Sequence, residues 1–109
     1  MKKIPVLAAL VLFGAAVTVH AADAKTNWSK YCAKCHGIDA KANTKNGKKL
    51  KMRDYTDPKI QANFTDEQAL TAIKVGLTDK DGNMRMEVAE GLKEDEMKAL
   101  VAYIRTFKR

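Results

Sequence analysis

Five consecutive residues, Cys32-Ala33-Lys34-Cys35-His36, place the only two cysteines of the chain three positions apart and directly before a histidine. On a helical turn, residues three apart lie on one face, so both sulfurs can reach the same edge of one bound group. Cys-x-x-Cys-His is the signature of c-type haem attachment, in which both thiols form thioethers and the histidine ligates the iron. The motif predicts one haem bound covalently through Cys32 and Cys35, with His36 as proximal ligand.

Three other kinds of site use the same residue types. A zinc site needs a fourth ligand, usually from a second Cys/His pair, but the only other histidine is His20. A thioredoxin-like dithiol expects a preceding strand and a βαβ pattern, whereas the flanks of this motif favour helix. A structural disulfide would close so short a loop that it constrains the unfolded chain very little. The sequence favours haem, and these three alternatives stay open.

The amino terminus predicts export. Two lysines precede an apolar run from Ile4 to Val19, and small residues follow it. This arrangement is typical of a signal peptide. The run is shorter than the roughly 20 apolar residues that span a bilayer comfortably, which argues against a permanent anchor. We expect residues 1–21 to be a signal peptide cleaved near Ala21 or Ala22, and residues 22–109 to form one haem-binding domain in the periplasm.

Export also limits the ligands of the iron. If His20 leaves with the signal peptide, His36 is the only histidine that remains, so a bis-histidine haem is excluded. The sixth position is then held by a methionine, by a weaker donor such as lysine, or is open. The candidate methionines are Met52, Met84, Met86 and Met97.

The charge of the chain is uneven. The full sequence has a formal net charge of +7, which falls to +5 when Lys2 and Lys3 leave with the signal peptide. Residues 22–59 carry ten basic and four acidic side chains, whereas residues 60–109 carry eight and nine. A positive rim in the half that carries the haem motif would steer the protein toward redox proteins with acidic docking surfaces. An ordinary lysine-rich surface explains the same counts, and no pattern indicates nucleic acid.

Apolar spacing predicts helices. A first helix should run from about Asp23 into the cysteine motif, and a second should begin at the capping box Thr65-Asp66-Glu67-Gln68 and end at Gly76. A last amphipathic helix is expected from Lys93 to about Phe107. Its inward face should carry Met97, Leu100, Val101 and Ile104.

Two polar segments are expected to be loops. The first runs from Gly37 to Asn63, where Pro58 interrupts any long helix, and should wrap around the haem. The second runs from Thr78 to Arg85 and contains an Asp81-Gly82 turn. No segment alternates long enough to predict a sheet. A mature chain of this length allows one domain with a thin core, to which haem adds apolar bulk.

Over essentially its whole mature length, the chain resembles the class I cytochromes c. In that family an aromatic four residues before the first cysteine and a small residue eight before it pack against an aromatic of the C-terminal helix. Here they look like Trp28, Ala24 and Tyr103. The resemblance implies an all-α, cytochrome c-like fold, with three to four helices wrapped around one covalently attached haem.

The family's Gly-Pro-x-Leu element looks like Gly47-Lys48-Lys49-Leu50. Lys48 stands where the family has the proline whose carbonyl orients the ligating histidine. Because any residue has that carbonyl, the resemblance implies a hydrogen bond from His36 to the carbonyl of Lys48.

The resemblance also implies a methionine ligand in the loop before the C-terminal helix. The family's methionine is followed, after a short gap, by the leucine that opens that helix, here Leu92, and Met86 fits this spacing best. Met84 is the second choice. Met97 is expected in the core and Met52 against the wall of the haem pocket. Glu87 follows Met86 where the family commonly has proline.

The function implied is one-electron transfer by a soluble, monomeric carrier rather than by an enzyme, between periplasmic or membrane redox partners. With His36 and Met86 both bound, the iron has no free site for a substrate, and no stable membrane insertion is expected after export. The alternative is a five-coordinate haem protein that binds nitric oxide or carbon monoxide, or has slight peroxidase activity. A further possibility is a fixed electron-entry partner of one periplasmic enzyme.

Overall fold

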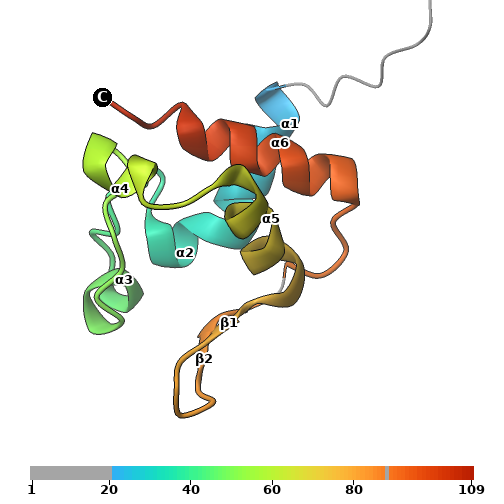
Figure 1. Cartoon of the computed structure of the whole chain (residues 1–109). Coiled ribbons are helices and arrows are strands. Elements are labelled where there is room, and N and C mark those ends of the chain that lie inside the picture. The colour runs from blue at the N-terminus through green and yellow to red at the C-terminus, as the bar shows by residue number, and fades with distance from the viewer. Residues whose placement is uncertain (1–20, 88) are drawn as a thin grey trace, which may run out of the picture.

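The computed structural model describes residues 21–87 and 89–109, so the predicted signal peptide lies outside the described residues except for Ala21. The described chain is mainly helical, which agrees with the predicted all-α fold class (Figure 1). Its elements, in chain order, are α1 (Ala21–Asn27), the π-helical segment η1 (Trp28–Cys32), α2 (Ala33–His36), α3 (Lys45–Lys49), α4 (Pro58–Ala62), α5 (Asp66–Val75), β1 (Leu77–Thr78), β2 (Met84–Met86) and α6 (Glu94–Arg105).

The core forms where the N-terminal helical segment packs against α6. Ala24, Trp28 and Leu100 are almost fully buried, and the Trp28 ring lies 6.1 Å from the ring of Tyr103 and 5.1 Å from that of Phe107. The indole Nε1 donates a hydrogen bond of 2.9 Å to the carbonyl of Gly37, so the buried ring leaves no polar atom unsatisfied. The predicted contact between Trp28 and Tyr103, with Ala24 buried beside it on α1, is confirmed.

The two other predicted helices form with the expected ends. At the start of α5 the Thr65 hydroxyl accepts from the Gln68 N–H, and the Gln68 side chain accepts in return from the Thr65 N–H. The helix ends at Gly76, whose φ is 75°. At the start of α6 the Glu96 carboxylate accepts from the Lys93 N–H. The buried residues of α6 are Leu100, Val101 and Ile104, all on the predicted inward face.

The two segments predicted as loops contain short helices and strands, so that prediction is wrong in part. The first contains α3 and α4, and Pro58 begins α4, because proline suits the first helical position and the Asp57 carboxylate caps the Lys59 N–H. No long helix runs through this fully described segment, as expected from Pro58. The segment expected as a simple loop pairs as an antiparallel hairpin, which projects beyond α5 (Figure 1). The Asp79 carboxylate closes its turn by accepting from the N–H groups of Asp81 and Asn83. Its strands are too short to show an alternating pattern in the sequence.

One side chain of α6 ties the C-terminal helix to the segment before α5. The Arg105 guanidinium donates to the Asp66 carboxylate, to the Phe64 carbonyl, and to both the backbone and side-chain oxygens of Gln61. It also lies over the Phe64 ring, 4.2 Å from its centroid. Gln61 is buried and donates to the carbonyls of Tyr55 and Ile104. This hydrogen-bonded cluster joins three segments that are distant in sequence.

We expect Arg105→Met to lower the free energy of unfolding of the haem-loaded protein by about 2–3 kcal/mol. The variant removes the charge-assisted hydrogen bond to Asp66. It also leaves two backbone carbonyl oxygens, those of Gln61 and Phe64, without their donor. The measurement is denaturant unfolding followed by far-ultraviolet circular dichroism. Lys74→Met is the control, because it breaks only the exposed ion pair with Glu94 and should cost at most about 1 kcal/mol. Equal losses in the two variants would contradict the central role of Arg105.

Candidate functional site

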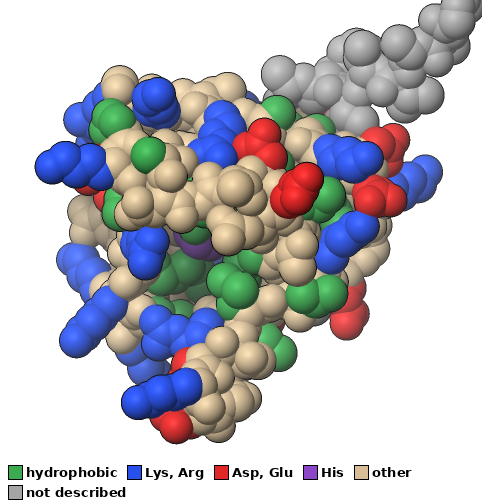
Figure 2. All heavy atoms as spheres, viewed as in Figure 1, with side chains coloured by type: hydrophobic (Ala, Val, Ile, Leu, Met, Phe, Trp, Pro, Cys, Tyr) green, Lys and Arg blue, Asp and Glu red, His purple; other side chains and the backbone are tan. Residues whose placement is uncertain are grey.

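A cavity of about 340 Å³ lies between the cysteine motif and the hairpin. Cys32, Cys35 and His36 line one side, and the methionines of β2 line the other. Figure 2 shows the hollow, where the purple side chain is His36, the only histidine of the described residues, among hydrophobic side chains. The structure therefore brings the predicted attachment motif to the wall of one concave site whose lining is both apolar and polar.

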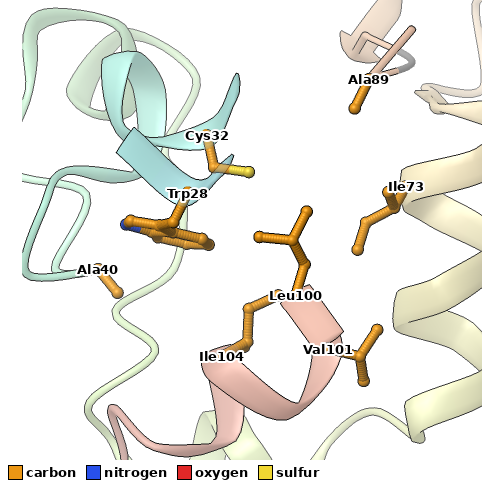
Figure 3. Close-up of a cluster of buried hydrophobic side chains, with 8 residues drawn as sticks. All are labelled: Trp28, Cys32, Ala40, Ile73, Ala89, Leu100, Val101 and Ile104. Carbon is orange, nitrogen blue, oxygen red and sulfur yellow. The ribbon is translucent and has the colours of Figure 1, made fainter. Parts of the chain in front are cut away.

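The cysteine motif sits at the junction of η1 and α2. Cys32 ends the π-helical segment and is 8% exposed, and its sulfur points toward the space bounded by Leu100, Ile73 and Ala89 (Figure 3). Cys35 is half-buried on α2. A π-helical turn is rare and often occurs at a functional site, because it changes the direction of the side chains that follow. Here it places the first sulfur inside the cavity.

The two cysteines are free thiols in this structure. Burial raises the pKa of the Cys32 thiol to about 11, with a smaller contribution from neighbouring Cys35, so the thiol is neutral at ordinary pH. Among residues 21–87 and 89–109, no cluster of three or more His, Cys, Asp or Glu side chains could hold a metal ion by itself.

His36 is a neutral imidazole held between two aromatic rings. Its ring lies 5.3 Å from the stacked ring of Tyr55 and 5.5 Å from that of Trp28. The side chain is buried, and this burial lowers the pKa of His36 to about 4. At neutral pH the ring keeps a free lone pair, which is the state that ligates a metal.

The predicted hydrogen bond from His36 to Lys48 is absent from the described structure. The Lys48 carbonyl instead accepts from the N–H of Lys51, which closes the turn after α3. The Nδ1 atom of His36 is buried without a hydrogen-bond partner among the described residues. His36 thus lacks, among the described residues, the second hydrogen bond that usually orients a ligating histidine.

Thr44, which no sequence signal linked to the site, contacts the backbone of the cysteine motif. The Thr44 hydroxyl donates to the Cys35 carbonyl at 2.6 Å and accepts from the Gly47 N–H at 2.8 Å. The Ala42 N–H donates to the carbonyl of His36. Threonine directly before a short helical run is an N-cap signal, which could have predicted the start of α3 but not its contact with Cys35.

Gly47 is required where α3 passes behind the motif. A methyl group at this position would lie 2.9 Å from the Cys35 carbonyl oxygen and closer still to that of Ala42. Both neighbours are backbone atoms, so they can give way only if the loop moves. We expect Gly47→Ala to cost about 1–3 kcal/mol of stability and to broaden the spectrum of the bound haem, because Cys35 shifts.

The control for Gly47→Ala is Lys48→Ala, since Lys48 is an exposed neighbour on the same short helix. Its stability should change by less than about 0.5 kcal/mol. Thermal unfolding monitored by haem absorbance measures both variants. If Gly47→Ala were as stable as the parent protein, the proposed close packing behind Cys35 would be wrong.

Three of the four candidate methionines line the cavity. Met86 is half-buried and packs against the hydrophobic core, whereas Met84 is 55% exposed at the rim. Met52 contributes to the cavity wall, and Met97 packs against the core from α6, as expected of both. The greater burial of Met86 favours it over Met84 as the iron ligand, an assignment that stays a prediction.

Arg85 lies between these two methionines in the sequence and makes a contact that no sequence signal indicates. Its guanidinium donates to the carbonyl of Leu50 at 2.6 Å, which ties the hairpin to the loop after the cysteine motif. The strand pairing is irregular at this point, with Leu77 opposite Met86 and Thr78 opposite Met84. A bulge in the hairpin thus accompanies the approach of β2 to the cavity.

The residues of the cavity fit a covalently bound haem. Two free thiols, a neutral imidazole and a soft thioether are its usual donors, and they line one cavity. A mainly helical fold with these donors in one cavity is typical of c-type haem proteins. None of the helices within the described ranges combines the length and apolar character needed to cross a membrane.

Comparison with known proteins identifies the family. The model of the family described as Cytochrome c matches residues 21–108, and the chain belongs to this family of haem-binding electron carriers. A solved structure described as KustC0563 c-type cytochrome is 31% identical, with a TM-score of 0.64, and the match covers 80% of this chain and 99% of that one. A structure of a mutant of Kustc0563 is 32% identical, with the same TM-score and coverage of 79% and 99%. No curated protein matches significantly. Membership of this family implies a covalently bound haem c.

Proposed function

We propose that this protein is a one-electron carrier whose single haem c is held by Cys32 and Cys35, with His36 and Met86 as axial ligands. The observation that carries the proposal is their common cavity, to which two segments far apart in the sequence contribute. When bound, haem supplies an iron that exchanges one electron between its ferric and ferrous states.

Each donor of the cavity has a separate task. The two cysteines hold the cofactor through many redox cycles, because thioether bonds do not dissociate. His36 offers a neutral nitrogen from a ring that Trp28 and Tyr55 keep in place. The thioether of Met86 favours ferrous iron and raises the reduction potential relative to a second histidine, as does the exclusion of water by the core. Two side-chain ligands leave no position for a substrate, which supports a carrier rather than an enzyme.

We further propose that this carrier works in the periplasm, after removal of residues 1–21, and shuttles between redox proteins with acidic docking surfaces. Lys30 and Lys34 support the acidic partner, since both are exposed and line the cavity beside the cysteine motif. Docking of this kind should be weak and fast, because a carrier must leave its partner after delivery.

The test is the visible and near-infrared spectrum of the exported protein, oxidised and reduced, together with its alkaline pyridine derivative. A low-spin c-type spectrum with the weak ferric-iron-to-methionine band would support the proposal. A high-spin spectrum would overturn it in favour of a five-coordinate, ligand-binding haem protein. Absence of haem would overturn both functions and restore the dithiol or disulfide interpretation of Cys32 and Cys35.

A further inference from the structure

The mouth of the haem cavity is an exposed surface with an apolar centre. Tyr31 and Met84 line the cavity, and both also line a neighbouring hollow of about 660 Å³. They are 37% and 55% exposed, so both offer apolar surface to a partner. The two openings share these residues, so Tyr31 and Met84 form the centre of one continuous face.

This face carries opposite charges on its two sides. The lysine pair Lys30 and Lys34 lines the cavity and not the neighbouring hollow. The glutamate pair Glu87 and Glu90 lines the neighbouring hollow, and Glu87 also reaches the cavity. We call these pairs the basic lip and the acidic lip. All four side chains are exposed, and none forms an ion pair with another described residue.

The position of Arg85 adds to this separation of charge. Its guanidinium reaches the carbonyl of Leu50, in the loop that follows the cysteine motif, so its positive charge lies on the cavity and not on the neighbouring hollow. Lys30 adjoins the apolar centre, because its ammonium lies 5.1 Å from the centroid of the Tyr31 ring. The mouth is therefore bipolar, whereas the sequence indicated only an excess of basic residues in the half that carries the haem motif.

A bipolar face with an apolar centre is complementary to itself. An isologous contact pairs the same patch with itself, and a two-fold axis that runs between the two lips in the plane of contact sets each lip of one copy opposite the other lip of its neighbour. We propose that two copies of this protein dock transiently through this face. Lys30 and Lys34 of one copy then lie opposite Glu87 and Glu90 of the second copy, with Tyr31 and Met84 between them.

This inference rests on the proposed function in one respect: the contact brings two haem sites mouth to mouth. A ferrous copy gives one electron to a ferric copy, so the first is oxidised and the second reduced, and no bond forms or breaks. The contact area is small and its ion pairs are exposed, so each pair contributes little and the complex is short-lived. Transient docking of this kind permits rapid exchange of electrons between copies.

The first test is the rate of electron self-exchange in the haem-loaded protein, measured by NMR in mixtures of its oxidised and reduced forms. Both copies carry net positive charge, so general repulsion alone predicts that the rate rises with salt. Complementary lips predict the opposite, a fall of at least about threefold from roughly 20 to 200 mM salt. A rate that rises with salt, or does not change, would overturn the proposal.

Charge-reversal variants distinguish the effect of the paired lips from the effect of the total net charge. Lys30→Glu with Lys34→Glu lowers the net positive charge, so general repulsion predicts faster self-exchange. The proposal predicts slower self-exchange, because both lips are then acidic. Mixing this variant with Glu87→Lys/Glu90→Lys should restore fast exchange between the two variants. The control is Lys45→Glu with Lys48→Glu, which makes the same charge change at two exposed residues that do not line the cavity and should not slow exchange.

A second readout does not depend on electron transfer. In the fully reduced protein, the backbone amide signals of Tyr31 and Glu90 should shift with protein concentration, and those of α3 should not. Salt should suppress the shifts. If the haem spectrum is low-spin with the methionine band but these shifts are absent, the docking inference is wrong and the proposed function still stands. If the spectrum is high-spin, the proposed function fails, and the concentration-dependent shifts still decide whether the copies dock.

Discussion

Cys32→Ala combined with Cys35→Ala is expected to abolish covalent haem attachment completely. The two cysteines are the only ones in the chain, and Cys32 points its sulfur into the cavity (Figure 3). Any haem that the double variant holds through His36 should pass into acidified organic solvent. The measurement is the pyridine derivative of the extracted and protein-bound fractions, with haem staining of a denaturing gel as a second readout.

The single variants refine this prediction. Each keeps one thiol, so a thioether should still resist extraction, with an absorption band displaced from that of the parent protein. Lys34→Ala is the control, because it changes an exposed spacer residue of the motif and leaves both sulfurs in place. Retention of acid-stable haem in the double variant would show that the attachment does not use Cys32 and Cys35.

Met86→Ala is expected to open the sixth position and to lower the reduction potential. A drop on the order of 100 mV is reasonable, since axial ligands and their surroundings set haem potentials over a range of roughly 0.8 V. The near-infrared methionine band should disappear, and added carbon monoxide should bind the reduced protein. Protein-film voltammetry and absorption spectra measure these effects.

Met84→Ala is the matched control for Met86→Ala. Both residues lie on β2 and line the cavity, but Met84 is 55% exposed whereas Met86 packs against the core. The methionine band and the potential should therefore survive the loss of Met84. If the two variants exchange these phenotypes, Met84 is the ligand and the assignment by spacing is wrong.

The local parts of this protein could be predicted because their signals are local. Cys-x-x-Cys-His indicates haem attachment from residues within about one helical turn. The capping box at Thr65 likewise depends on residues only three positions apart. The amphipathic stripe of α6 likewise follows from helical periodicity. Trp28 and Tyr103 are far apart in sequence, and their contact was predictable only through resemblance to a known family.

Contacts across the loops could not be predicted in this way. The Lys48 carbonyl was expected to orient His36, but the turn after α3 uses that oxygen for Lys51. Thr44 binds the Cys35 carbonyl from behind, and Arg85 reaches the Leu50 carbonyl across the cavity. Competition among nearby backbone groups decides such hydrogen bonds, and a pattern in the sequence does not record which partner wins.

By itself, the sequence determined the attachment motif, the helical class and the set of possible ligands, since each depends on residue type at short spacing. Only the tertiary structure decided which methionines share the cavity with His36, and that Met86 is more buried there than Met84. It also brought Lys30 and Lys34 to one face with Glu87 and Glu90, although the two pairs are far apart in the sequence. The physical reason is that packing of distant segments sets burial and the direction of charge, whereas composition counts charges without placing them.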